Sequence, residues 1–144
     1  MKLSIVTLLV LLIAAGCSSV SNVADVKAKS RGVKAFTIQD FNATDLATAK
    51  LFQDTIQGRL EKDGYYISDR PDFVVSGVIT KTRGSWTTGG DWIDSAIITA
   101  KTKDGQLLTS IRFDQGSSAV MWWGSKSPAD IANDLGKKLS KNLR

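Results

Sequence analysis

Cys17 is the only cysteine in this 144-residue chain, which contains no histidine. Histidine is the commonest general base and metal ligand in proteins, and a cysteine thiolate is a frequent alternative nucleophile. The acids are Glu61 and thirteen aspartates. Asp91 and Asp94 are close in sequence, but a spacing of three places them on opposite faces of a strand. These residue types argue against an enzyme, and we expect no catalytic residue, no metal site and no cofactor.

The sequence before Cys17 is a short apolar run behind a positive start. Met1-Lys2 is followed by the almost unbroken apolar stretch 3–15, which is shorter than the about 20 residues that cross a bilayer. It has the length of a signal-peptide core followed by small residues. Two alternatives are an ordinary secretory signal, which would leave a lone thiol in an oxidising compartment, and an uncleaved membrane anchor.

The residues Ala14-Ala15-Gly16-Cys17 resemble the lipobox of bacterial lipoproteins, with Ala14 where leucine is commoner. This resemblance implies that the signal peptide 1–16 is removed and that Cys17 carries the lipid, including a fatty acyl chain such as palmitate. Ser18 after the cysteine implies the outer membrane of a Gram-negative cell, with the domain facing the periplasm. We then expect a lipidated flexible tether over 17–32 and a single domain over 33–144.

The composition of the mature chain limits the classes of partner that it can bind. The 128 residues from Cys17 onward carry 18 lysines and arginines against 14 acids, a net charge of +4. These charges are spread along the chain without the dense basic block of a nucleic-acid-binding arm. We therefore expect no nucleic-acid partner. A chain of this length forms one domain with a substantial core.

Hydrophobic patterns and turn signals predict two helices and five strands in this domain. Asp45 and its neighbours can cap a helix that ends before Gly64, and Ser127-Pro128 begins a second helix. Asp104-Gly105 predicts a tight hairpin. Strands are expected over 33–41, 65–68, 73–85, 92–103 and 106–115, and a short strand inside the tether is an open possibility.

The predicted fold is α+β: a two-layer sandwich in which two helices cover one face of a mostly antiparallel sheet of four or five strands. The order is β-α-β-β-β-β-α. It resembles the small α/β modules of envelope lipoproteins, such as the lipopolysaccharide-assembly and penicillin-binding-protein-activator lipoproteins. The first helix is expected to bury Leu46, Phe52, Ile56 and Leu60. In the strand 92–103, we expect Ile93 and Ile97 on the face opposite to Ala96 and Ile98.

Four tryptophans are the candidate binding residues: Trp86, Trp92, Trp122 and Trp123. The strand order predicts that all four lie at one rim of the sheet, with Arg83 and Lys126 close by. Aromatic residues are frequent hot spots in interfaces, so we expect a partner, peptide, glycan or membrane to bind there. The alternative is that these rings cap the core, which applies most to Trp86 and Trp123.

The sequence thus predicts an outer-membrane-anchored lipoprotein without catalytic activity, which acts as an adaptor or accessory binding module for another cell-envelope component. Its partners would be the membrane, through the lipid on Cys17, and an envelope protein. The alternative is a small-ligand or glycan-binding lipoprotein with a tryptophan-lined pocket. A hydrolase that uses aspartates alone is disfavoured, because glycoside hydrolysis needs two carboxylates at a defined separation on convergent elements.

Overall fold

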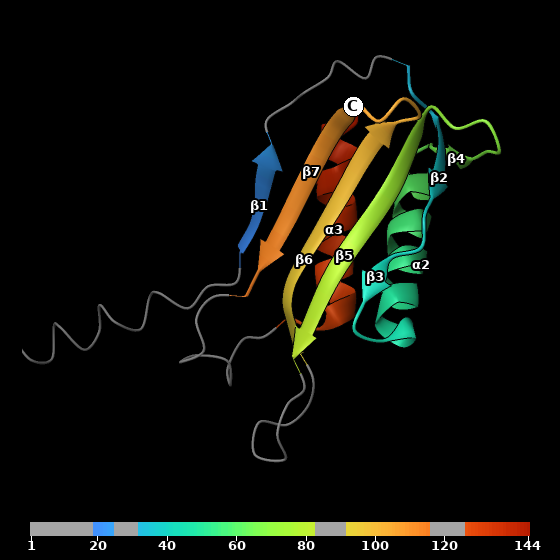
Figure 1. Cartoon of the computed structure of the whole chain (residues 1–144). Coiled ribbons are helices and arrows are strands. Elements are labelled where there is room, and N and C mark those ends of the chain that lie inside the picture. Colours follow the sequence, from blue (N-terminus) through green and yellow to red (C-terminus); the bar gives the residue numbers. More distant parts are fainter. Residues whose placement is uncertain (1–18, 25–31, 83–91, 116–125) are drawn as a thin grey trace, which may run out of the picture.

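The computed structural model describes residues 19–24, 32–82, 92–115 and 126–144. In these residues the chain forms seven strands and two helices (Figure 1). The strands are β1 (Ser19–Ala24), β2 (Ala35–Ile38), β3 (Asn42–Ala43), β4 (Tyr66–Ile67), β5 (Phe73–Thr82), β6 (Trp92–Thr102) and β7 (Leu107–Asp114), and the helices are α2 (Leu46–Lys62) and α3 (Pro128–Asn142).

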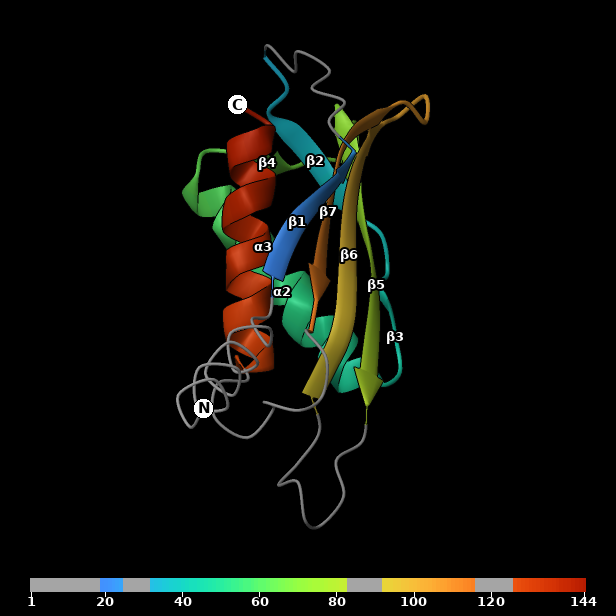
Figure 2. The same ribbon diagram turned by 90° about the vertical axis from the view of Figure 1, so that its left-hand side faces the viewer.

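All seven strands belong to one twisted sheet, and both helices lie on the same face of it (Figures 1 and 2). The strand order is β1-β7-β6-β5-β2-β4, and β3 pairs with β5 beyond the end of β2. The pairs β1–β7, β7–β6 and β6–β5 are antiparallel, whereas β2 is parallel to both β5 and β4. The predicted α+β class, the two layers and the placement of both helices on one face are confirmed.

The sheet has two strands that the predicted order lacks. β3 is a two-residue strand directly before α2. β1 lies inside the segment 17–32 that we expected to be a flexible tether, where a short strand was an open possibility. It pairs antiparallel with β7, with Ser19 opposite Asp114 and Val20 opposite Phe113. The described part of that segment is therefore an edge strand of the domain.

The two helices begin where the sequence predicts. Asp45 is the N-cap of α2, and its carboxylate accepts a hydrogen bond from the Thr48 amide at 2.8 Å. Ser127 caps α3 by accepting from the Asp130 amide, with Pro128 in the first turn. Gly64 follows α2 with a φ of 93°, a conformation that glycine adopts without strain.

The core lies between the helices and the sheet. Ala49, Phe52, Ile56 and Leu60 form the buried stripe of α2. α3 buries Ile131, Ala132, Leu135, Gly136 and Leu139. At Gly136 an added Cβ would lie 3.2 Å from the Cβ of Arg59, so this glycine lets the two helices approach closely.

The prediction that Leu46 is buried is wrong, because its side chain is 89 % exposed. Leu46 is the first residue of α2 and lies about 80° around the helix from Ile56, at about 100° per residue. It is therefore outside the buried stripe, at the very end of the helical layer.

A β-bulge in β6 corrects the predicted faces of this strand. Ser95 pairs with Thr80 and Ile93 pairs with Lys81, so Asp94 is an extra residue in β6. A bulge restarts the alternation of side chains between the two faces. Ile93 consequently lies in the core with Ala96 and Ile98, contrary to the prediction, while Ile97 is only half-buried.

Gly77 in β5 leaves the space that the Phe41 ring fills. A Cβ built on Gly77 would lie 2.6 Å from Phe41 Cδ2 and 3.0 Å from Ile98 Cδ1. Phe41 is itself only 6 % exposed and belongs to the core. The ring therefore closes the core directly over the backbone of β5, and any side chain at position 77 must displace it.

We predict that Gly77→Ala lowers the free energy of unfolding by about 1–3 kcal/mol, the usual cost of overpacking a core. The matched control is Gly58→Ala in α2, where an added Cβ meets no atom within 4 Å. That change should raise stability by about 0.5–1 kcal/mol, because alanine favours helix. Urea denaturation of both variants checks the pair, and an equally stable Gly77→Ala would contradict the packing described.

Candidate functional site

The structure describes two of the predicted site residues, Trp92 and Lys126. Trp92 is the first residue of β6 and is half-buried, and Lys126 is an exposed residue before α3. Cys17, Arg83, Trp86, Trp122 and Trp123 lie outside the described residues. The common rim of four tryptophans therefore stays a prediction.

The described residues define the end of the domain to which these segments attach, and we call it the tryptophan end. β5 finishes at Thr82, which pairs with Trp92 at the start of β6. Asp114 at the end of β7 pairs with both Ser95 and Ser19. Both helices begin at this end, which is at the bottom of Figures 1 and 2. The segments 83–91 and 116–125 join elements here.

Trp92 is held in place by the bulge in β6. Its indole Nε1 donates a hydrogen bond to Asp94 Oδ1 at 3.0 Å, and the Gln115 amide donates to the Asp94 carbonyl oxygen at 2.8 Å. A buried or half-buried indole N–H usually needs such a partner. The bulge therefore orients the half-buried Trp92 ring at the tryptophan end.

Asp45 connects the start of α2 to the end of β5. Its carboxylate accepts from the Thr48 amide and also lies 3.0 Å from Lys81 Nζ, and the Lys81 amide donates to Thr44 Oγ1 at 3.4 Å. The hydrogen bond from the Thr48 amide, together with the one from Lys81, lowers the pKa of Asp45 from 3.8 to about 2. This connection positions the exposed Leu46 at the tryptophan end.

Leu46 is an exposed residue at this end, although the sequence pattern predicts it in the core. Two features of the sequence point to its exposure: it follows the capping Asp45 directly, and it is off the axis of the stripe formed by Phe52, Ile56 and Leu60. Lys126, at the same end, lies 2.6 Å from Asp134 in a salt bridge with the second turn of α3. The ammonium groups of Lys81 and Lys126 are thus both paired with carboxylates of the domain.

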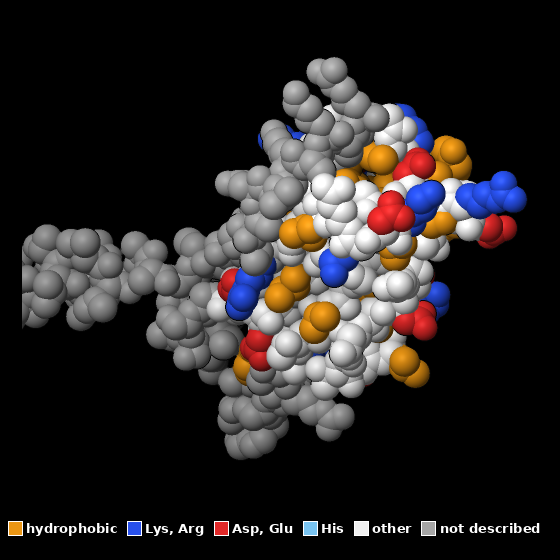
Figure 3. All heavy atoms as spheres, turned by 45° about the horizontal axis from the view of Figure 1, so that its top comes forward, with side chains coloured by type: hydrophobic (Ala, Val, Ile, Leu, Met, Phe, Trp, Pro, Cys, Tyr) orange, Lys and Arg blue, Asp and Glu red, His pale blue; other side chains and the backbone are white. Residues whose placement is uncertain are grey.

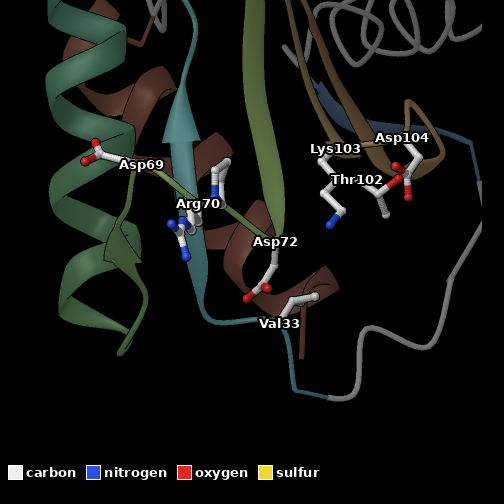
Figure 4. Close-up of a pocket in the computed structure, with 8 residues that line it drawn as sticks. Val33, Asp69, Arg70, Asp72, Thr102, Lys103 and Asp104 are labelled. Atoms are coloured by element: carbon white, nitrogen blue, oxygen red, sulfur yellow. The ribbon is translucent and has the colours of Figure 1, made fainter.

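The opposite end of the domain holds an open cavity of about 540 Å³ (Figure 4). The residues that line it are Val33, Asp69, Arg70, Pro71, Asp72, Thr102, Lys103 and Asp104. Asp72 accepts hydrogen bonds from the amides of Lys34 and Ala35, both at 2.9 Å, which lower the pKa of its carboxyl group. Its main role is therefore structural, since it fixes the start of β2 against β5.

The surface around this cavity is chemically mixed. Figure 3 shows lysine, arginine and acidic side chains interspersed there, with separate apolar patches. Tyr66 and Ile67 of β4 are exposed at the edge of the sheet, at 56 % and 48 %. Trp92, the tryptophan that the structure describes, is not among the residues that line this cavity.

Among the described residues, no cluster of acidic, cysteine or histidine side chains is arranged to hold a metal ion. Within the same residues, no helix has the length and apolar character needed to span a membrane.

Comparisons with known proteins show a fold likeness without a recognised family. No protein-family model and no curated protein sequence matches the chain. PelC from Paraburkholderia phytofirmans, solved as a dodecamer, is similar with a TM-score of 0.61 at 12 % identity, over 88 % of this chain and 97 % of that one. Lipoprotein GNA1162 from Neisseria meningitidis aligns with a TM-score of 0.45 at 14 % identity, over 76 % of this chain and 97 % of its own.

The cap at Asp45 predicts how stability depends on pH. Because the pKa of Asp45 is lowered by folding, its carboxylate stabilises the folded state above about pH 4, and this contribution is lost as the pH falls toward 2. Asp45→Asn keeps a capping oxygen but removes the titration and the bridge to Lys81. Its free energy of unfolding should therefore depend less steeply on pH between 2 and 4 than that of the wild type.

Urea denaturation at a series of pH values measures this slope. Asp54→Asn removes a carboxylate from the exposed side of the same helix, where Asp54 pairs with Lys50, and controls for the loss of one negative charge. Identical slopes for Asp45→Asn and the wild type would show that Asp45 is not the titrating cap.

Proposed function

We propose that the chain is an outer-membrane-anchored lipoprotein of a Gram-negative cell, acylated on Cys17, whose periplasmic domain works without catalysis. The domain acts as an adaptor or accessory module that binds another component of the envelope with its tryptophan end. This proposal joins the lipobox resemblance of the sequence to the geometry of the described residues.

One observation carries the proposal: β1 pairs with β7 so that Ser19 lies at the tryptophan end. Cys17 is only two residues before Ser19. A lipid on Cys17 would therefore hold this end of the domain beside the membrane, and multiple acyl chains give stable attachment. Whatever the tryptophan end binds must then lie in or next to the membrane.

A role without catalysis is supported by what the acidic side chains do. Asp45 caps α2, Asp72 fixes the start of β2, and Asp94 accepts from Trp92. These carboxylates are engaged in holding the fold, and the sequence provides no histidine to act as a general base.

The fold likeness supports a module that assembles with other chains. The PelC structure is a dodecamer, so a chain with this fold can build a large homo-oligomer, and a second copy of this chain is one candidate partner. The alternative is a ligand pocket lined by the tryptophans, which would be a different site from the cavity described above, because that cavity lies at the other end of the domain.

Crosslinking in living cells tests the proposal. The wild-type protein should fractionate with the outer membrane, carry the mass of an acylated cysteine and form crosslinks to an envelope component that mass spectrometry identifies. Cys17→Ser should lose the acyl mass and the membrane fraction together. Replacing Trp122 and Trp123 by alanine should greatly reduce the crosslinks and leave the unfolding temperature of the domain unchanged.

The matched control replaces Tyr66 and Ile67, which are exposed apolar residues at the opposite end of the domain. This control should keep the crosslinks. Undiminished crosslinking after loss of Trp122 and Trp123 would remove the tryptophan end as the binding surface, and an unmodified Cys17 would remove the anchor.

A further inference from the structure

We infer that the tryptophan end of the domain rests directly on the lipid bilayer, with Leu46 in contact with lipid and the strands β5, β6 and β7 leading away from the membrane. This inference deepens the proposed function and rests on the acylation of Cys17. It adds a direct contact between this end and the lipid surface beside the anchor.

The segment of chain between the anchor at Cys17 and the sheet is very short. Cys17 is two positions before Ser19, with only Ser18 between them, and an extended chain spans at most about 3.6 Å per residue. The Cα atom of an acylated Cys17 therefore lies within about 7 Å of Ser19. Because Ser19 is fixed opposite Asp114 by the β1–β7 pairing, the domain cannot drift away from the bilayer as it could on a tether of some 15 flexible residues.

An exposed leucine, Leu46, lies at the tryptophan end. Leu46 is 89 % exposed, the largest exposure among the large apolar side chains that the structure describes. It stands at the N-terminus of α2, which begins at the same end of the domain as α3 (Figures 1 and 2). An apolar side chain in this position gains by contact with acyl chains and gains nothing in water.

Polar groups at this end have partners within the domain. The indole N–H of Trp92 is bonded to Asp94 within the strand, so the ring can meet the interface without an unsatisfied donor. Tryptophan is enriched where proteins meet the headgroup region of a membrane. The ammonium groups of Lys81 and Lys126 are paired with Asp45 and Asp134. Carboxylates thus offset both of these ammonium charges, and among the described residues Leu46 and Trp92 supply the apolar part of the contact.

The opposite end of the domain then faces the periplasm. It is the end with the cavity and with interspersed charges of both signs (Figure 3). The exposed residues Tyr66 and Ile67 also lie there, because β4 pairs with the start of β2.

The single native cysteine makes the inference directly testable. In the full-length acylated protein the sulfur of Cys17 is blocked, so a cysteine introduced by Leu46→Cys can be labelled alone with the fluorophore NBD. The matched variant is Ile67→Cys, at an exposed apolar position of the opposite end. Each labelled protein is reconstituted into phosphatidylethanolamine–phosphatidylglycerol vesicles and purified by flotation.

NBD at position 46 should emit at shorter wavelength than NBD at position 67, resist quenching by aqueous iodide and lose most of its fluorescence to doxyl-labelled lipid. NBD at position 67 should emit at longer wavelength, be quenched by iodide and keep most of its fluorescence in the presence of doxyl-labelled lipid. A label on Leu51→Cys, about 7.5 Å further along α2 and 37 % exposed, should be quenched less by doxyl lipid than the label at 46.

The outcomes separate this inference from the function on which it rests. Protein that floats with the vesicles but whose label at 46 is as open to iodide as the label at 67 overturns the inference alone. Protection from iodide without quenching by doxyl lipid also overturns it, because a second protein chain then covers the site. Failure to float, with Cys17 itself open to labelling, overturns the anchor and the inference together.

Discussion

The antiparallel pairing of β1 with β7 fixes the relation between this domain and its N-terminal segment. β1 is an edge strand, and its register sets Ser19 opposite Asp114 at the tryptophan end. Without this pairing, the residues after Cys17 would form a long tether and the domain would have no defined orientation. With it, Ser19, the starts of both helices and the half-buried Trp92 lie at the same end of the domain.

The rest of the fold supports that geometry. The core between the sheet and the two helices holds the long strands β5, β6 and β7 in register, and the Phe41 ring closes it over Gly77. The bulge at Asp94 turns Ile93 into the core and at the same time gives the Trp92 indole its hydrogen-bond partner. Asp45 then ties α2 to the end of β5 through Lys81. Packing and polar contacts therefore converge on the tryptophan end.

The sequence alone predicts those elements whose signals are local. The Asp45 and Ser127 caps, the hairpin at Asp104-Gly105 and the apolar stripe of α3 each depend on a few neighbouring residues, and all are found. β1 depends instead on its partner, because a polar six-residue segment has no hydrophobic pattern of its own and becomes a strand only where β7 offers an open edge. The bulge at Asp94 likewise changes the face of Ile93 through cross-strand register. The exposure of Leu46 follows from its place directly after the Asp45 cap, outside the buried stripe of α2. Of the predicted site residues, the sequence alone fixes which elements they adjoin, and the structure describes Trp92 and Lys126.

Hydrogen exchange of the membrane-bound, acylated protein tests most directly whether β1 couples the domain to the proposed anchor at Cys17. Amides of β1 that bond to β7 should exchange more slowly than the same amides in an unstructured peptide. Amides of the central strand β6, measured in the same sample, should also exchange slowly. Slow exchange in both strands is the result that this account predicts. Exchange of Ser19–Ala24 at the rate of an unstructured peptide, with β6 still protected, would show that these residues are a free tether and would contradict it.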